Sequence, residues 1–304
     1  MSERYPGVRV QSEGSPLRIR HGLIIRFFIH RSHAEFAPGL LRALNTYMQA
    51  VGPEVLAWYP DVEGDWQRLD DTAWERTRQA LLAEAVHTFA TLVDRPDGGV
   101  DFQFDYEGIS LEAPGLLDDP GRACVVTFWL PTKFLEERGP RYVRELALKL
   151  ASHLPYDSGY SSLIFNTSAQ FTTVTRQIDK LCFRYPGVDV LNQRVSWDIG
   201  TRVPGAYWLT FLGPPVLGEL GGVEGLRARL SAPGTTVQPL EDHRAVVTLG
   251  EWPEAGDLEA GDDLPAYREL ARVLEPWLYH DASRVFDPNF PPEDTLRWER
   301  RLLD

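Results

Sequence analysis

The clearest indication of the fold comes from residues 124–166, "CVVTFWLPTKFLEERGPRYVRELALKLASHLPYDSGYSSLIFN". This stretch opens with the apolar and β-branched run "CVVTFWL", which is typical of a buried strand. From residue 139 to residue 154 the apolar side chains recur every three or four positions, and Pro140 stands in the first turn. That pattern predicts an amphipathic helix. Residues 158–166 return to a strand pattern, so the stretch is one strand–helix–strand unit.

Similar units begin elsewhere along the chain. The run "LIIRFFIH" (23–30) precedes a helix over 36–51, and "AYWLTFL" (206–212) precedes two short helices that end near Leu230. Further strands are predicted over 100–108, 235–240 and 243–250, and a helix over 264–278. The pattern predicts an α+β fold in which helices pack on largely antiparallel sheets built from recurring strand–helix–strand units. An internal duplication stays open, because the units share little residue identity.

One helix is predicted to begin where Thr72 and Glu75 fit a capping box. Its apolar face continues through Leu82 and Val86 to Phe89. No Ser-, Gly- or Pro-rich linker divides the chain. We therefore expect a polar N-terminal arm over 1–20 and a single compact domain over 21–304, with two fused lobes as the alternative.

Composition limits the partners of the protein. The 304 residues carry a net charge of −13, which argues against nucleic acid or an anionic membrane as the main partner. Both cysteines lie inside apolar segments, which favours free thiols in a reducing compartment. No secretory signal is visible, and the longest apolar runs are too short to span a membrane. We therefore expect a cytoplasmic protein.

Residues 152–166 contain the residue types of a hydrolase triad. These are His153, Asp157, Ser158, Ser161 and Ser162. The nucleophile-elbow motif G-x-S-x-G is incomplete, because Leu163 stands in place of the second glycine. Asp157, Ser158 and Gly159 are ordinary turn residues. The sequence therefore predicts no catalytic site, and a serine hydrolase that uses His153 is kept as a minor alternative.

Metal and cofactor motifs are also missing from the sequence. His30 and His33 are three residues apart, but no third or fourth ligand follows in a known pattern. The glycines of "GPPVLGELGG" (213–222) fit neither a phosphate-binding loop nor a dinucleotide-binding motif. We expect no metal and no cofactor.

An acidic run, "EWPEAGDLEAGDD" (251–263), contains no basic residue. Its candidate binding residues are Glu251, Trp252, Glu254, Asp257, Glu259, Asp262 and Asp263. One interpretation is a solvated loop that also provides the N-cap of the next helix. The other is a negative surface that meets a cationic cleft of another protein, with Trp252 either an aromatic anchor or a core residue.

Five stretches, in their order along the chain, resemble the type VI secretion immunity family often called TsiV-like. They are "LLRALNTYMQAVGPEVLAWYP", "RELALKLASHLPYDSGYSSLIFN", "FRYPGVDV", "GAYWLTFLGPPVLGELGG" and "GDDLPAYRELARVLEP". The resemblance covers roughly residues 20 to 300, and the acidic stretch 251–256 lies outside its pattern.

The resemblance implies a protein that does not act as an enzyme. It implies an immunity protein, or antitoxin, that binds and neutralises one cognate type VI effector toxin, often a nuclease. An acidic protein suits the basic substrate groove of a nuclease, whose active or substrate-binding surface it would occlude. The alternative from another class is a structural or adaptor protein of the secretion apparatus.

Overall fold

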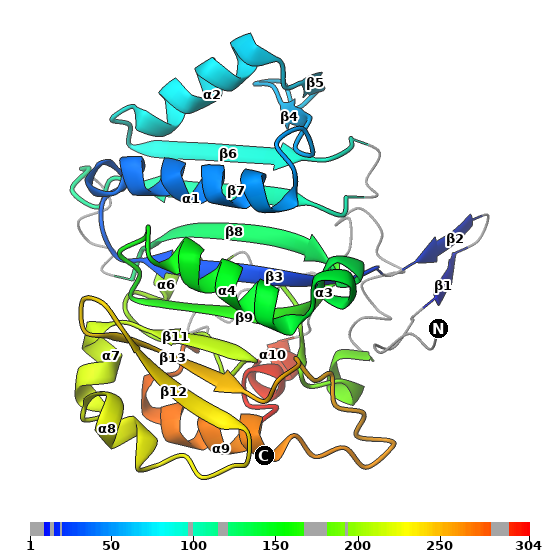
Figure 1. Cartoon of the computed structure of the whole chain (residues 1–304), viewed down its shortest axis with the longest axis vertical. Coiled ribbons are helices and arrows are strands. Elements are labelled where there is room, and N and C mark those ends of the chain that lie inside the picture. Colours follow the sequence, from blue (N-terminus) through cyan, green and yellow to red (C-terminus); the bar gives the residue numbers. More distant parts are fainter. Residues whose placement is uncertain are drawn as a thin grey trace.

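A computed structural model describes residues 9–12, 15–18, 20–96, 100–114, 121–166, 181–191, 194–280 and 292–304. Within these residues the strands form an 11-stranded sheet and a separate two-stranded hairpin (Figure 1). The order in the sheet is β12-β13-β11-β9-β3-β8-β7-β6-β4-β5, and β10 pairs with β9. The α+β class is confirmed.

The strands are as follows: β1 (Arg9–Ser12), β2 (Ser15–Arg18), β3 (Arg20–Ile29), β4 (Trp58–Pro60), β5 (Trp66–Arg68), β6 (His87–Val93), β7 (Gln103–Ile109), β8 (Cys124–Pro131), β9 (Ser158–Asn166), β10 (Val188–Asp189), β11 (Leu209–Leu212), β12 (Thr235–Leu240) and β13 (Arg244–Leu249). The helices are α1 (Ala37–Val51), α2 (Asp71–Leu82), α3 (Thr132–Arg138), α4 (Pro140–Ala151), α6 (Val195–Asp198), α7 (Pro214–Glu219), α8 (Gly222–Arg227), α9 (Pro265–Leu274) and α10 (Pro292–Glu299).

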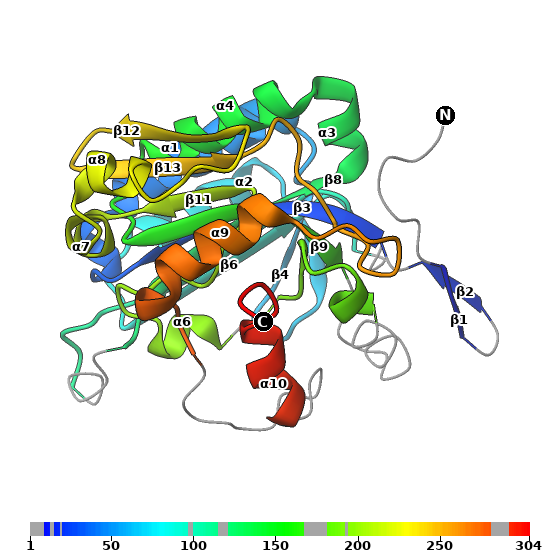
Figure 2. The same ribbon diagram turned by 90° about the horizontal axis from the view of Figure 1, so that it is seen from below.

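Strand β3 lies at the centre of the sheet. It pairs antiparallel with β8 on one side and with β9 on the other. Helices α1 and α4 cover one face of the sheet, and α6, α9 and α10 lie on the other (Figure 2). Alternate residues of β3 therefore enter two different cores: Phe27 joins the larger cluster and Phe28 the smaller one. Burial on both faces explains why β3 and β8 read as nearly continuous apolar runs in the sequence, and the serines of β9 are buried as well.

A buried carboxylate ties the end of the chain to the second face of the sheet. The hydroxyls of Tyr160 and Tyr207 donate to Asp189, at O···O distances of 2.8 and 3.3 Å. The Arg301 guanidinium lies 3.8 Å from the same carboxylate. Burial raises the pKa of Asp189, and the charge of Arg301 opposes that rise. Residues 183–190, one of the family-like stretches, are fixed in place by this contact.

Two local predictions are wrong around α2. The helix cap is Asp70, whose carboxylate accepts from the Ala73 N–H at 2.8 Å, and not Thr72. The helix ends at Leu82, and Phe89 belongs to β6. The spacing of apolar residues 82, 86 and 89 fits a helix, and for this reason the helix was predicted to continue to Phe89. Residues 87–93 also alternate, and pairing with β7 selects the strand.

The N-terminal arm contains the β1–β2 hairpin. Its division from residues 21–304 stays a prediction. Among the described residues, no helix has both the length and the apolar character needed to cross a membrane.

Candidate functional site

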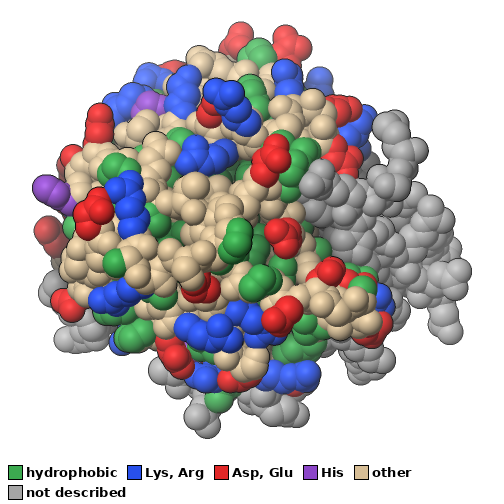
Figure 3. All heavy atoms as spheres, turned by 60° about the horizontal axis from the view of Figure 1, so that its bottom comes forward, with side chains coloured by type: hydrophobic (Ala, Val, Ile, Leu, Met, Phe, Trp, Pro, Cys, Tyr) green, Lys and Arg blue, Asp and Glu red, His purple; other side chains and the backbone are tan. Residues whose placement is uncertain are grey.

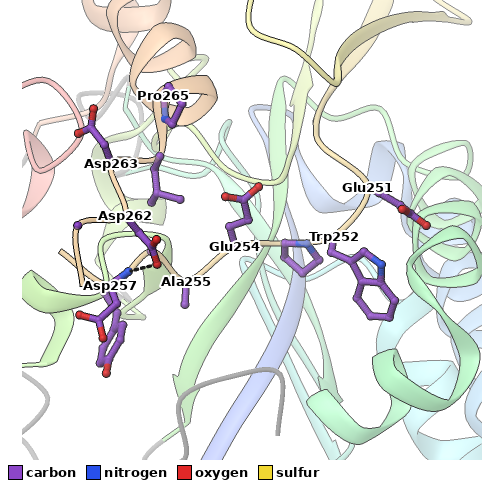
Figure 4. A pocket seen from close by; sticks show the side chains of 13 residues that line it. Glu251, Trp252, Glu254, Ala255, Asp257, Asp262, Asp263 and Pro265 are labelled. Atoms are coloured by element: carbon purple, nitrogen blue, oxygen red, sulfur yellow. Dashed lines mark hydrogen bonds between the residues drawn. The ribbon is translucent and has the colours of Figure 1, made fainter. Parts of the chain in front are cut away.

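The acidic run connects β13 to α9 and lines a cavity of about 790 Å³. Tyr185, from the family-like stretch 183–190, lines the same cavity. Figure 4 shows the run in two parts, with Glu251 and Trp252 on one side of Glu254 and the carboxylates of Asp257, Asp262 and Asp263 on the other. The two parts have different electrostatic environments.

An arginine from a distant segment neutralises two carboxylates of the run, Asp257 and Glu259. The Arg184 guanidinium donates to both oxygens of Asp257, at 2.8 and 2.6 Å. It also lies 2.5 Å from the Glu259 carboxylate. These contacts hold the pKa of the Asp257 carboxyl below its usual range. Asp257 and Glu259 are therefore already paired within the chain, and a partner would have to compete with Arg184 for them.

Asp262 and Asp263 also make contacts inside the chain. The Asp257 N–H donates to the Asp262 carboxylate at 3.1 Å. The Arg268 guanidinium lies 3.0 Å from the Asp263 carboxylate. The N-cap position of α9 is Leu264, and no side chain caps that helix. The expectation that the acidic run supplies an N-cap is therefore wrong, because Asp263 binds Arg268 instead.

The backbone of the run is held against residues 184–187. The Gly187 N–H donates to the Ala255 carbonyl at 2.8 Å, and the Leu258 N–H donates to the Arg184 carbonyl at 3.0 Å. A Cβ at Gly187 would lie 2.1 Å from the Glu254 carbonyl oxygen, so only glycine allows this close approach. The Tyr267 hydroxyl accepts from the Glu254 N–H at 3.1 Å. The run is thus anchored on several sides.

Glu251 and Glu254 remain available for a partner. Both side chains are exposed, and no ion pair in the described part of the chain neutralises either of them. Trp252 lies between them in sequence, is partly exposed, and packs against the main core. It is therefore a core residue on one side and a surface residue on the other. Two unpaired carboxylates beside a fixed aromatic ring resemble the anchors that dominate binding at protein interfaces.

The rest of this end of the molecule is not uniformly acidic. On the face shown in Figure 3, acidic and basic side chains are interspersed. The net charge of −13 is therefore not gathered into one area of that face. The short segment Glu251–Glu254 is a more specific candidate than the total charge.

Sequence reasoning missed Arg184 and Arg268. Arg184 lies 73 residues from Asp257, and nothing in the spacing of the two residues indicates that they meet. The only indication in the sequence that these two arginines matter was their place in the family-like stretches. Arg184 lies within "FRYPGVDV" and Arg268 within "GDDLPAYRELARVLEP", two of the stretches that carry the family resemblance.

The hydrolase and metal candidates are not assembled into sites. His153 Nε2 lies 3.1 Å from the Thr46 hydroxyl, and no hydrogen bond between described residues joins it to a serine. Ser158, Ser161 and Ser162 are buried in β9. The ring nitrogens of His30 and His33 meet the Arg122 carbonyl and the Tyr106 hydroxyl. In the described ranges, no three His, Cys, Asp or Glu residues gather as a metal site would require.

Replacing Arg184 with Met is expected to raise the pKa of Asp257 toward its ordinary value. The lowered pKa means that the Arg184 contact stabilises the fold above the unfolded-state pKa of Asp257, and that this stabilisation is lost as the pH falls through the folded-state pKa. In Arg184→Met this contribution of Asp257 should be absent, so the variant should be less stable at neutral pH and should lose less stability than the wild type as the pH falls through this range. NMR titration of the Asp257 carboxyl carbon measures the shift. Arg141→Met removes an exposed arginine paired with Glu145 and is the control. Equal Asp257 titration in both variants would contradict the expectation.

Comparison with known proteins finds a matching family model and solved structures of similar fold. A family model described as type VI immunity for VRR-NUC (TsiV) matches residues 39–302. A solved T6SS protein of Pseudomonas aeruginosa has a similar structure, with a TM-score of 0.73 and 19% sequence identity. The alignment covers 93% of this chain and 81% of that chain, and at this identity it shows a shared fold. No curated protein matches the chain.

Proposed function

Since this chain belongs to the TsiV family of type VI immunity proteins, we propose that it binds and neutralises an effector toxin that carries a VRR-NUC domain. The family model covers most of the chain, from residue 39 to residue 302. The chain acts by binding and has no catalytic step of its own. This is the function that the anchored acidic run and its cavity support best.

The observation that carries this proposal is the segment Glu251–Glu254. Two exposed carboxylates without an internal counter-charge flank a ring that the core holds in place. A nuclease binds a polyanion and therefore presents a basic surface. The segment offers that surface negative charge and a rigid aromatic contact, so the effector need not displace Arg184 or Arg268. Asp257, Glu259, Asp262 and Asp263 then support the shape of the run and add a second layer of negative potential.

Neutralisation follows from steric occlusion. An acidic protein seated on a basic groove keeps nucleic acid out of that groove. Opposite charges also raise the association rate, which for electrostatically steered protein pairs reaches about 10⁸–10⁹ M⁻¹s⁻¹ at low salt. Binding occurs in the cytoplasm, where the buried thiols of Cys124 and Cys182 remain reduced.

The direct test is co-expression with the effector encoded beside this chain's gene. Cells that express the effector alone should stop growing, and cells that also express this chain should survive. Purified effector should bind the purified chain, and the association rate should fall as the salt concentration rises. Effector toxicity unchanged by co-expression, with no complex between the purified proteins, refutes the function. Co-purification with subunits of the secretion apparatus in place of an effector would favour an adaptor.

A further inference from the structure

The outer edge of β6 carries backbone groups without a partner strand. The Ser110 N–H donates to the Val86 carbonyl and the Asp94 N–H to the Phe102 carbonyl. These two bonds set the alternation of the β6–β7 ladder, so the backbone groups of residues 88, 90 and 92 point toward β7. Those of His87, Phe89 and Thr91 point away from it. On that side β4 pairs with β6 at one position, Trp58 with Val93.

Three N–H groups and three carbonyls therefore lie along an open edge. In the described part of the chain, the pairing of β4 with β6 consists of Trp58 with Val93, so no strand residue is paired with His87, Phe89 or Thr91 on this side. An edge of this kind is a template for another strand, and proteins usually protect it with charged residues or Pro. The β6 sequence "HTFATLV" contains no Lys, Arg, Asp, Glu or Pro.

The opposite edge of the same sheet is protected at every outward position. In β12 the Thr235 N–H donates to the Ala232 carbonyl at 3.1 Å. The Val237 carbonyl accepts from Arg227 Nη2 at 2.8 Å. Pro239, the third outward residue, has no N–H to leave unpaired. The outward backbone groups of β12 are protected and those of β6 are not. The open edge is therefore particular to β6 and is not shared by both edges of the sheet.

The surface beside the open edge is apolar and acidic. Phe89 is 66% exposed and Val86 is 51% exposed. The His87 and Phe89 rings are parallel, with centroids 6.2 Å apart. Glu107 lies directly across from Phe89 on β7, and neither Glu107 nor the exposed Glu84 makes an ion pair with any residue in the described ranges. A strand that pairs here meets an exposed ring and unneutralised carboxylates.

We infer that the open edge of β6 accepts an extended, basic segment of the effector as an additional strand. Residues of that segment pair with the backbone of His87, Phe89 and Thr91. An Arg or Lys side chain opposite Phe89 lies over the ring and extends toward Glu107. The inference rests on the proposed function, because it assigns the segment to the effector.

A single extended segment fits this edge better than a second copy of the chain. Helix α2 extends past β6 at the end of the molecule where the edge is open (Figure 1). A second copy would bring its own helices onto the same face and meet α2, whereas an isolated strand brings none. The edge is also separate from the acidic run, because five strands lie between β6 and β13 in the sheet. Variants at one end should therefore leave the other end intact.

The test uses the full chain and the effector encoded beside its gene, with affinity measured by calorimetry. Thr91→Pro removes one outward N–H and leaves the β6–β7 backbone bonds in place. It also removes the hydroxyl that donates to Asp105 at 2.9 Å, so Thr91→Val, which keeps the N–H, is its matched control and should bind like the wild type. Phe89→Lys places a positive charge where the basic side chain is expected. Each is expected to weaken binding at least tenfold. The controls are Val62→Pro and Val62→Lys, at a fully exposed turn position that accepts Pro. Both controls should bind like the wild type.

The outcomes separate this inference from the function on which it rests. Wild-type affinity in Thr91→Pro and Phe89→Lys, with unchanged melting temperatures, overturns the β6 assignment and leaves the proposed function standing. Failure of the wild-type chain to bind the effector overturns both. Sedimentation of the free chain as a dimer that Thr91→Pro converts to a monomer would show that a second copy occupies the edge, and the effector assignment would then be wrong.

Discussion

Replacing Glu251 and Glu254 with Lys and Trp252 with Ala is expected to weaken effector binding at least a hundredfold. An aromatic anchor at the centre of an interface contributes about 2 kcal/mol or more, and like charges facing each other cost several kcal/mol more. Neither glutamate side chain has an ion pair or a hydrogen bond to a described residue, whereas Asp262, which also lacks an ion pair, accepts a hydrogen bond from the Asp257 N–H. Both the association rate and the dissociation rate should change, because charge reversal slows association and removal of the ring speeds dissociation. Surface plasmon resonance at two salt concentrations measures both.

The control for this variant reverses the same amount of charge elsewhere. Glu136→Lys with Glu219→Lys changes two exposed glutamates, on α3 and α7, that have no ion pair with a described residue. If binding depends on the net charge alone, both variants weaken it equally. Equal losses would contradict a specific role for Glu251, Trp252 and Glu254. Equal retention of binding would place the interface elsewhere.

Phe27→Ala is expected to lower the free energy of unfolding by about 3–5 kcal/mol, the usual result for a large buried aromatic residue. Phe27 is fully buried in the central strand β3. Its ring centroid lies 5.1 Å from that of Phe211 and 5.3 Å from that of Tyr156. Removing the ring leaves a cavity between strands that the backbone ladders of β8 and β9 keep from closing. Urea denaturation followed by circular dichroism measures the loss.

Phe89→Ala is the matched control for stability, because it makes the same substitution in the same sheet at a side chain that is 66% exposed. Its effect should stay within about 0.5 kcal/mol, as is usual for surface positions. A similar loss in the two variants would mean that Phe89 is buried in solution, which would also close the edge of β6. The pair therefore tests both the core and the exposure on which the β6 inference depends.

Local pattern predicted most elements of this fold. The unit over 124–166 contains the expected strands, and its expected helix is α4, whereas the short helix α3 before it was not predicted. Strands β12 and β13 and the short helices α7 and α8 also occur where they were expected. The prediction of a helix through Phe89 is wrong because the apolar spacing there fits both a helix and a strand. Pairing with β7, which lies later in the chain, selects the strand.

The candidate site was only half visible from the sequence. Its residues are contiguous, so composition identified the acidic run. Composition did not reveal which charges remain free, because the arginine that pairs with Asp257 and Glu259 lies 73 residues before Asp257. Charge in a folded protein depends on partners that the fold brings together. Of the seven candidate residues, we therefore propose Glu251, Trp252 and Glu254 for the effector contact.

The central place of β3 has a consequence for the timing of protection. β3 is made early, yet its two neighbours, β8 and β9, begin 95 and 129 positions after its last residue. At about 5–20 residues per second, a ribosome needs on the order of ten seconds to supply them. Non-local strand pairing of this kind also folds slowly once the chain is complete. Under the proposed function, a newly started chain therefore offers no immediate defence, and survival of an attack depends on the stock of folded protein that the cell already holds.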